Sequence, residues 1–298
     1  MKLDIEYAQA PLGHKIHGVD VAHLDDDQFR QIEDLWNRHG VVVIAGQKLS
    51  PDEHIAFTRR FGDLEKFVID AYNLPGKPEI FVVSNIIENG KPIGMADAGR
   101  MWHSDMCFTP VPPRGSFLYA LEVPMLNGQP LGDTYFASTA AAYDALPEAT
   151  RRRIDGLRAV NSFSARVAVA AERAEKAGNV DPATIAHMKA ERDKTKAEVP
   201  DVEHPLVRTH PITGRKCLYV SDLITSDIVG MPAEEGRALL KTLLEHVTRP
   251  QFVYRHRWQV GDLVMWDNCS SMHQAVGDFQ LPLRRRMHRT TLKGTPPF

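Results

Sequence analysis

A histidine and an aspartate stand two residues apart in this chain, at His103 and Asp105. In extended backbone, side chains at this spacing point to the same face, so the two would converge on one point while Ser104 faces away. A metal ion needs a third ligand, and His273 is the best candidate. Two imidazoles and one carboxylate with open coordination positions are the ligand set of non-heme Fe(II) oxygenases. A lone His-x-Asp pair is more often a surface pair or a hydrogen-bonded core histidine, so further signals are needed.

Arginines crowd the C-terminal region, at Arg284, Arg285, Arg286 and Arg289. On a strand, Arg285 and Arg289 share one face, and their side chains start roughly 13 Å apart. That spacing lets one guanidinium bind a carboxylate while the second meets a different anion. Arginine suits both tasks because its planar fork matches a carboxylate and stays charged when desolvated. The alternative is a charged edge strand, but the cluster follows His273 by 11 to 16 residues, which favours a shared anion site.

The elements that must position these residues are mostly short strands. Apolar segments bounded by turn residues predict strands over residues 14–20, 40–45, 79–84, 116–123, 134–136, 204–210, 217–220, 252–258, 263–266 and 285–292. Helical spacing predicts helices over residues 25–38, 51–61, 138–146 and 232–247. This pattern is typical of a mainly β fold, a sandwich or jelly roll with helices packed outside.

The segment 165–197 has a different composition from the rest of the chain. It is rich in Ala, Glu, Lys and Arg, has few bulky apolar residues, and is divided by Pro182 into two expected helices. Such a segment contributes little to a core, so a solvated helical insert is the plainer interpretation. The functional alternative is a mobile lid that orders when substrate binds.

The whole chain sets further limits. It has 298 residues with 36 basic and 38 acidic side chains, so no strong net charge favours nucleic acid or a membrane surface. No apolar run is long enough to span a bilayer, and the first residues lack the apolar region of a signal peptide. Three cysteines without paired spacing fit a reducing compartment, and Cys107 and Cys269 are interpreted as small apolar fillers. We therefore expect one cytoplasmic domain, residues 1–298, with a small-molecule partner.

Together these motifs resemble the taurine/2,4-dichlorophenoxyacetate dioxygenase family. The order and spacing agree at residues 102–105, 132–134, 266–273 and 285–289. The similarity covers nearly the whole chain outside 165–197. It is especially close to the phenoxyacetate branch over 204–210 and 252–268.

The resemblance implies a double-stranded β-helix (jelly roll) fold and a reaction that uses Fe(II), 2-oxoglutarate and O₂. It implies these roles: iron ligands His103, Asp105 and His273; partners of the distal 2-oxoglutarate carboxylate Thr134 and Arg285, with Trp258 lining their pocket; and Arg289 facing the acid group of the substrate. The carboxylate at Asp105 favours hydroxylation, because related halogenases lack it. Relatives form dimers, trimers or tetramers, so the resemblance also implies a homo-oligomer.

The substrate is expected to be a small anionic organic acid. Sulfonate-hydroxylating relatives carry a histidine and a tyrosine after the first helix, whereas this chain has Lys66 and Phe67 in that segment. Phe67 and Phe108 would stack an aromatic body and Lys66 would add a cation, although both phenylalanines also suit a core. We therefore expect an aryloxyalkanoate, such as 2,4-dichlorophenoxyacetate, with ether cleavage. A taurine or alkylsulfonate dioxygenase is the alternative within the family.

Two alternatives come from other classes. The same three ligands would hold zinc in a hydrolase, where the metal activates water. Paired arginines fit that reaction poorly, because hydrolysis needs no fixed dicarboxylate cosubstrate. A non-enzymatic, cupin-like module that binds a small acid is the other alternative, and the open coordination positions of the ligand set argue against it.

Overall fold

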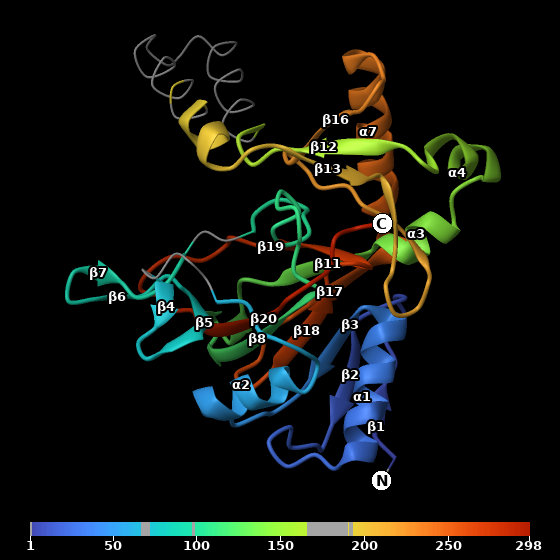
Figure 1. The fold of residues 1–298 in the computed structure, drawn as a ribbon. Helices are drawn as coiled ribbons and strands as arrows, with labels where there is room; N and C mark the ends of the chain where they lie inside the picture. The colour runs from blue at the N-terminus through green and yellow to red at the C-terminus, as the bar shows by residue number, and fades with distance from the viewer. Residues whose placement is uncertain (1, 67–71, 97–98, 166–189, 191–192) are drawn as a thin grey trace.

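The computed structural model describes residues 2–66, 72–96, 99–165, 190 and 193–298. Within them, the largest element is an eight-stranded sheet of order β1-β2-β3-β18-β8-β20-β5-β4, antiparallel except for the pair β2 and β3 (Figure 1). Its strands are β1 (Asp4–Glu6), β2 (His14–His17), β3 (Val41–Ile44), β4 (Asn73–Leu74), β5 (Lys77–Ser84), β8 (Gly115–Glu122), β18 (Leu263–Asp267) and β20 (Arg286–Leu292).

A smaller sheet of order β17-β11-β19 lies against one face of the large sheet (Figure 1). It is formed by β11 (Thr134–Ser138), β17 (Val253–His256) and β19 (Ser271–Ala275). Apolar side chains from both sheets fill the space between them, among them Leu118 and Met287 of the large sheet and Phe136 of the small one. This two-sheet arrangement is the jelly-roll core that the resemblance implies.

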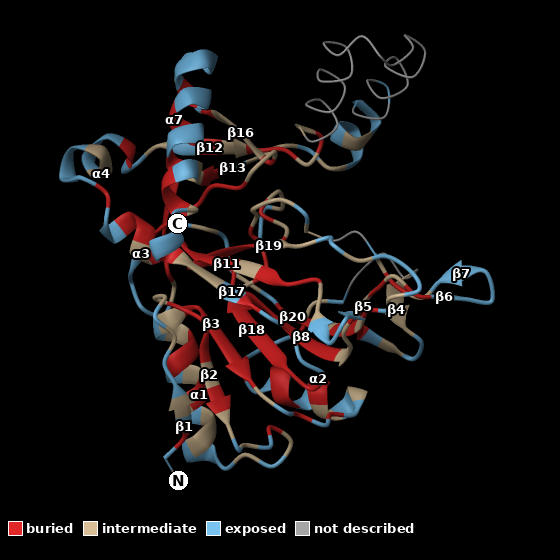
Figure 2. Ribbon diagram, turned by 180° about the vertical axis from the view of Figure 1, so that it is seen from behind, coloured by how far each residue is buried: buried red, intermediate tan, exposed pale blue. Residues whose placement is uncertain are grey.

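Two capped helices cover the other face of the large sheet (Figure 1). They are α1 (Asp26–His39) and α2 (Pro51–Arg59). Ser50 and Glu53 form a capping box at the start of α2, and Asp25 with Gln28 forms another at α1. Trp36 of α1 is fully buried in the cluster beneath both helices. Burial in Figure 2 follows this layering, with the central strands buried and the outer turns of the helices exposed.

The remaining elements form a second packed region beyond the small sheet. They are α3 (Thr139–Asp144), α4 (Glu148–Ile154), α7 (Ala233–Val247), β12 (Arg158–Asn161), β13 (Val202–Pro205), β14 (Val207–Thr209), β15 (Lys216–Leu218), β16 (Thr225–Ile228) and the 3₁₀ turn Pro250–Phe252. Two small hairpins, β6 (Ile87–Glu88) with β7 (Lys91–Pro92) and β9 (Met125–Leu126) with β10 (Gln129–Pro130), extend from the large sheet. A separate apolar cluster, which includes Ile154, Leu206 and Leu243, holds this region together.

Several sequence predictions need correction. The strand expected over 204–210 is two strands, because β13 pairs with β12 whereas β14 pairs with β15 in a different sheet. The segment around His103 is a single bridge to His273 followed by a turn, not a regular strand. Residues 166–189 and 191–192 of the expected insert lie outside the described residues. No helix in the described part of the chain is long and apolar enough to cross a membrane.

Candidate metal and anion site

His103, Asp105 and His273 come together at the end of the small sheet. The backbones of His103 and His273 exchange two hydrogen bonds, with N···O distances of 3.0 and 2.8 Å. Oδ1 of Asp105 is 3.9 Å from Nε2 of each histidine. One ligand atom from each residue lies within 4.8 Å of the others, which makes these residues a candidate metal site.

Hydrogen bonds orient the carboxylate of Asp105. Its Oδ2 accepts a hydrogen bond from Ser116 Oγ at 2.7 Å and from Trp266 Nε1 at 3.2 Å. The other oxygen, Oδ1, therefore faces the histidines, and Nη1 of Arg289 donates to it at 3.3 Å. Burial opposes the charge of Asp105, but Arg289 and the two histidines outweigh it and hold the pKa of Asp105 well below its usual range.

The two histidines are suited to binding a metal through Nε2. Nδ1 of His103 lies 2.7 Å from the carbonyl oxygen of Met101, which places its proton on Nδ1 and leaves the Nε2 lone pair for a metal. Burial, helped by the charge of His103, lowers the pKa of His273 to about 3, so this imidazole is neutral at pH 7. Two imidazoles and one carboxylate that converge on one point fit a divalent transition metal.

Arg285 forms the anion-binding end of the site. Its side chain is buried just before β20, where Nη1 donates to the Gly132 carbonyl at 2.8 Å and Nε contacts Met287 Sδ at 3.2 Å. Burial, together with the nearby charge of Arg100, lowers the pKa of Arg285 to about 10, which still leaves it charged at pH 7. A buried cation with unsaturated hydrogen-bonding capacity is a strong binding group for a carboxylate.

Thr134 and Trp258 complete this end. Thr134 is buried at the start of β11, and its Oγ1 accepts a hydrogen bond from Trp258 Nε1 at 3.0 Å. The hydroxyl hydrogen of Thr134 is therefore free to donate to a bound anion. The guanidinium of Arg285 lies 5.7 Å from the centroid of the Trp258 ring. Trp258 thus supports the anion end from behind, and the structure does not place it among the residues that line the cavity.

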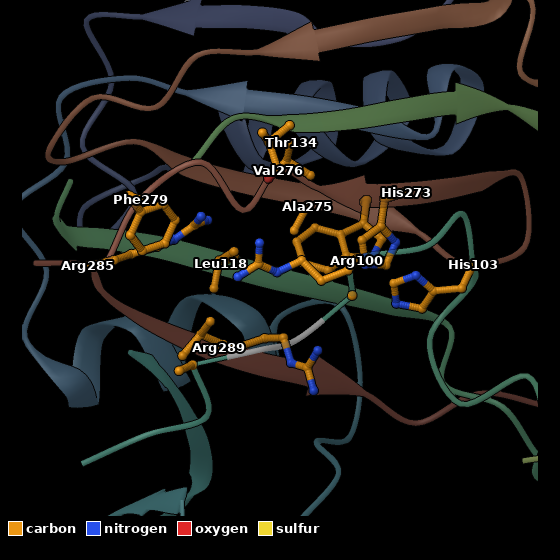
Figure 3. A pocket seen from close by; sticks show the side chains of 14 residues that line it. Arg100, His103, Leu118, Thr134, His273, Ala275, Val276, Phe279, Arg285 and Arg289 are labelled. Atoms are coloured by element: carbon orange, nitrogen blue, oxygen red, sulfur yellow. The ribbon is translucent and has the colours of Figure 1, made fainter. Parts of the chain in front are cut away.

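The metal and anion ends open into one cavity (Figure 3). Its described lining includes His103, His273, Thr134, Arg285 and Arg289. Residues that sequence reasoning did not find complete the wall: Val83, Ala96, Gly99, Arg100, Leu118, Trp266, Ala275, Val276 and Phe279. The closeness of Arg100 to His103 in sequence was the available signal for that residue. Gly99 and Ala275 offered the same signal, since each lies within four residues of a predicted ligand. Val83, Leu118 and Trp266 reach the cavity through strand register, which no local pattern encodes.

The remaining predicted substrate residues lie elsewhere. Phe108 packs against Phe163, with ring centroids 4.5 Å apart, next to a small cluster around Tyr219. The structure therefore does not bring Phe108 to the described cavity wall, because its ring is used in this packing. Lys66 is exposed and is not part of the described wall either. Phe67 lies outside the described residues.

Known proteins share this fold and much of this sequence. The family model "Taurine catabolism dioxygenase TauD, TfdA family" matches residues 4–291. The alpha-ketoglutarate-dependent 2,4-dichlorophenoxyacetate dioxygenase of Cupriavidus pinatubonensis is 38% identical over 280 residues, which cover 90% of this chain and 89% of that protein. The (S)-phenoxypropionate/alpha-ketoglutarate-dioxygenase of Delftia acidovorans is 34% identical over 306 residues, covering 99% of this chain and 96% of that protein.

A solved structure agrees with these relatives. The crystal structure of AAD-2 in complex with Mn(II) and N-oxalylglycine matches with a TM-score of 0.75 at 30% identity, and the match covers 100% of this chain and 99% of that one. The family match spans nearly the whole chain, and the relatives are named as alpha-ketoglutarate-dependent dioxygenases. This chain is therefore a 2-oxoglutarate-dependent dioxygenase and belongs to the TauD, TfdA family.

Proposed function

We propose that this enzyme hydroxylates a small aryloxyalkanoate carboxylate, using Fe(II), O₂ and 2-oxoglutarate. The observation that carries the proposal is the position of Arg289, whose guanidinium lies in the cavity wall 3.3 Å from the metal-facing oxygen of Asp105. A carboxylate bound by Arg289 would hold its neighbouring carbon beside the metal. Relatives that act on 2,4-dichlorophenoxyacetate and on phenoxypropionate support this substrate class. Membership of a dioxygenase family decides against the zinc hydrolase and the cupin-like binding module.

His103, Asp105 and His273 would hold the Fe(II) on one face, leaving positions for 2-oxoglutarate and O₂. Once bound, Fe(II) with these two molecules supplies the oxidising chemistry that couples decarboxylation of 2-oxoglutarate to substrate hydroxylation. The contribution of the protein is to orient the ligands. Ser116 and Trp266 hold the far oxygen of Asp105, so its near oxygen stays directed at the metal position.

Arg285 and Thr134 would bind the distal carboxylate of 2-oxoglutarate. The guanidinium of Arg285 and the hydroxyl of Thr134 are the buried donors at the end of the cavity that lies away from the histidines (Figure 3). Leu118, Val276 and Phe279 form apolar parts of the wall. Apolar walls keep water away from the reacting groups and strengthen the hydrogen bonds to the dicarboxylate.

Hydroxylation of an aryloxyalkanoate next to its ether oxygen gives a hemiacetal. The hemiacetal collapses by breaking the bond between the hydroxylated carbon and the ether oxygen. The ether oxygen leaves with the ring as a phenol, and the hydroxylated carbon becomes the carbonyl of an oxoacid as its hydroxyl proton passes to the departing oxygen. The enzyme would therefore act as an ether-cleaving enzyme. Arg289 would determine which carbon is attacked, because it fixes the acid group of the substrate.

The test is a comparison of acids in the presence of Fe(II), O₂ and 2-oxoglutarate. We expect 2,4-dichlorophenoxyacetate to stimulate succinate formation and to release one phenol per succinate. The variant Arg289→Ala should raise KM for this acid by about tenfold or more, since it removes a charge-assisted hydrogen bond. Stimulation by taurine or an alkylsulfonate, without stimulation by phenoxyacetates, would favour the sulfonate alternative instead.

We propose that residues 1–298 form one catalytic domain with a helical insert at 165–197, and that the enzyme is cytoplasmic. The resemblance to the family supports a homo-oligomer between dimer and tetramer. Light scattering on the purified protein tests the oligomer. Deletion of the segment 165–197, with KM for the acid as the readout, distinguishes a solvated insert, which leaves KM unchanged, from a lid, which raises it.

A further inference from the structure

Arg100 reaches into the cavity from the segment just before His103. Figure 3 shows its side chain extending across the cavity toward Arg285. The backbone on either side is fixed to β19: the Gly99 carbonyl accepts from Ala275 N at 2.7 Å, and the Arg100 carbonyl accepts from the Gln274 side chain at 3.0 Å. The guanidinium therefore belongs to a segment that is anchored beside the metal ligands.

The position of the guanidinium requires a glycine opposite it. A Cβ atom added at Gly277 would lie 0.6 Å from Nη1 and 1.9 Å from Cζ of Arg100. The backbone of Gly277 does not itself need glycine, because its φ lies outside the left-handed region. The missing side chain at Gly277 thus makes room for Arg100.

Arg100 and Arg285 act on each other electrostatically. After burial, the charge of Arg100 is the next cause that lowers the pKa of Arg285, while Asp278 and Asp133 act in the opposite direction. Two guanidiniums that face the same cavity repel each other. A carboxylate bound between them would relieve this repulsion and gain hydrogen bonds from both.

We propose that Arg100 is a second guanidinium of the cosubstrate site and binds the distal carboxylate of 2-oxoglutarate together with Arg285. This inference rests on the proposed placement of that carboxylate at Arg285 and Thr134. Arg100 supplies a cation from the exposed side of the cavity, whereas Arg285 supplies one from its buried end. The distal carboxylate would thus be bound by two guanidiniums on opposite sides.

The test measures ligand affinity without turnover. Protein loaded with Mn(II) is titrated by calorimetry with 2-oxoglutarate and with pyruvate, which keeps the oxoacid end but lacks the distal carboxylate. We expect Arg100→Ala to weaken 2-oxoglutarate binding by about tenfold and to leave pyruvate binding unchanged. The matched control is Arg284→Ala, which removes a neighbouring arginine that pairs with Glu122 on the outside of the sheet. It should change neither affinity.

Gly277→Ala provides an independent test, because it keeps the charge and displaces the guanidinium. We expect it to weaken 2-oxoglutarate binding as Arg100→Ala does, and to have no further effect in the double variant, because the two substitutions disrupt one interaction. The inference is refuted if Arg100→Ala binds 2-oxoglutarate as tightly as the unmodified protein does. It is also refuted if the substitution weakens pyruvate binding as much as it weakens 2-oxoglutarate binding. Arg285→Ala distinguishes failure of this inference from failure of the proposed cosubstrate site. If Arg285→Ala also binds 2-oxoglutarate with full affinity, the proposed cosubstrate site itself is wrong.

Discussion

Replacing Ser116 with alanine should loosen metal binding without removing a ligand. The hydroxyl of Ser116 is fully buried and donates to Oδ2 of Asp105 at 2.7 Å, a short hydrogen bond to a charged group. Such bonds contribute about 1.5–3 kcal/mol, which corresponds to about 10- to 100-fold in affinity. Trp266 still holds the same oxygen at 3.2 Å in this variant, so we expect the lower end, about tenfold weaker Mn(II) binding.

The assay is the electron paramagnetic resonance signal of free Mn(II) during titration of the metal-free protein. Ser270→Ala is a matched control, because the Ser270 hydroxyl also contacts a buried carboxylate, that of Asp267, which is not a candidate ligand. It should leave the affinity unchanged. Unchanged Mn(II) affinity in a folded Ser116→Ala protein would refute the idea that this hydrogen bond orients Asp105. Circular dichroism and Tm establish that each variant is folded.

Two further predictions concern buried titratable groups. Burial lowers the pKa of His54 to about 3 and that of His288 to about 4, so only the unfolded chain takes up protons as the pH falls below about 6.5. Their contribution to the free energy of unfolding is therefore complete above that pH and declines below it, by about 2 kcal/mol for each histidine at pH 5. We expect Tm to fall between pH 7.5 and pH 5. A Tm that stays constant over this range would contradict the expectation. Burial also raises the pKa of the Cys107 and Cys217 thiols to about 12. Both thiols should therefore react slowly with thiol reagents in the native protein at pH 7.5, and fully only after denaturation. Rapid labelling of the native protein would show instead that these thiols are accessible.

Patterns within a few neighbouring residues were sufficient to predict most of the helices and strands. The run Ser50-Pro51 with Glu53 encodes its own helix start, since a cap, a proline and a returning glutamate act within one turn. The two-residue spacing of His103 and Asp105 likewise brings both ligands to one place, although the turn after His103 replaces the expected strand. Predictions of this kind succeed because the interacting atoms are close in sequence.

Contacts set by strand pairing could not be predicted in the same way. Ser116 reaches Asp105 from β8 and Trp266 reaches it from β18, and their meeting depends on the register between those strands. The space at Gly277 accommodates the Arg100 guanidinium only when the segment of Arg100 is hydrogen-bonded to β19. A shift of one residue in the pairing of β8 with β18 would turn Ser116 or Trp266 to the opposite face. Such features are visible in the sequence only as ordinary serine, tryptophan and glycine residues.

The order of strands in the large sheet has a consequence for synthesis of the protein. The central strand β8 is paired on both sides, by β18 and β20, and these strands follow it in sequence only at residues 263 and 286. Until they leave the ribosome, both edges of β8, a largely buried apolar strand, lack their partners. Unpaired apolar edges promote aggregation, so unfinished chains should depend on chaperones. The same late segment carries His273, so a nascent chain holds only part of the candidate ligand set and has no complete site with which to bind a metal ion.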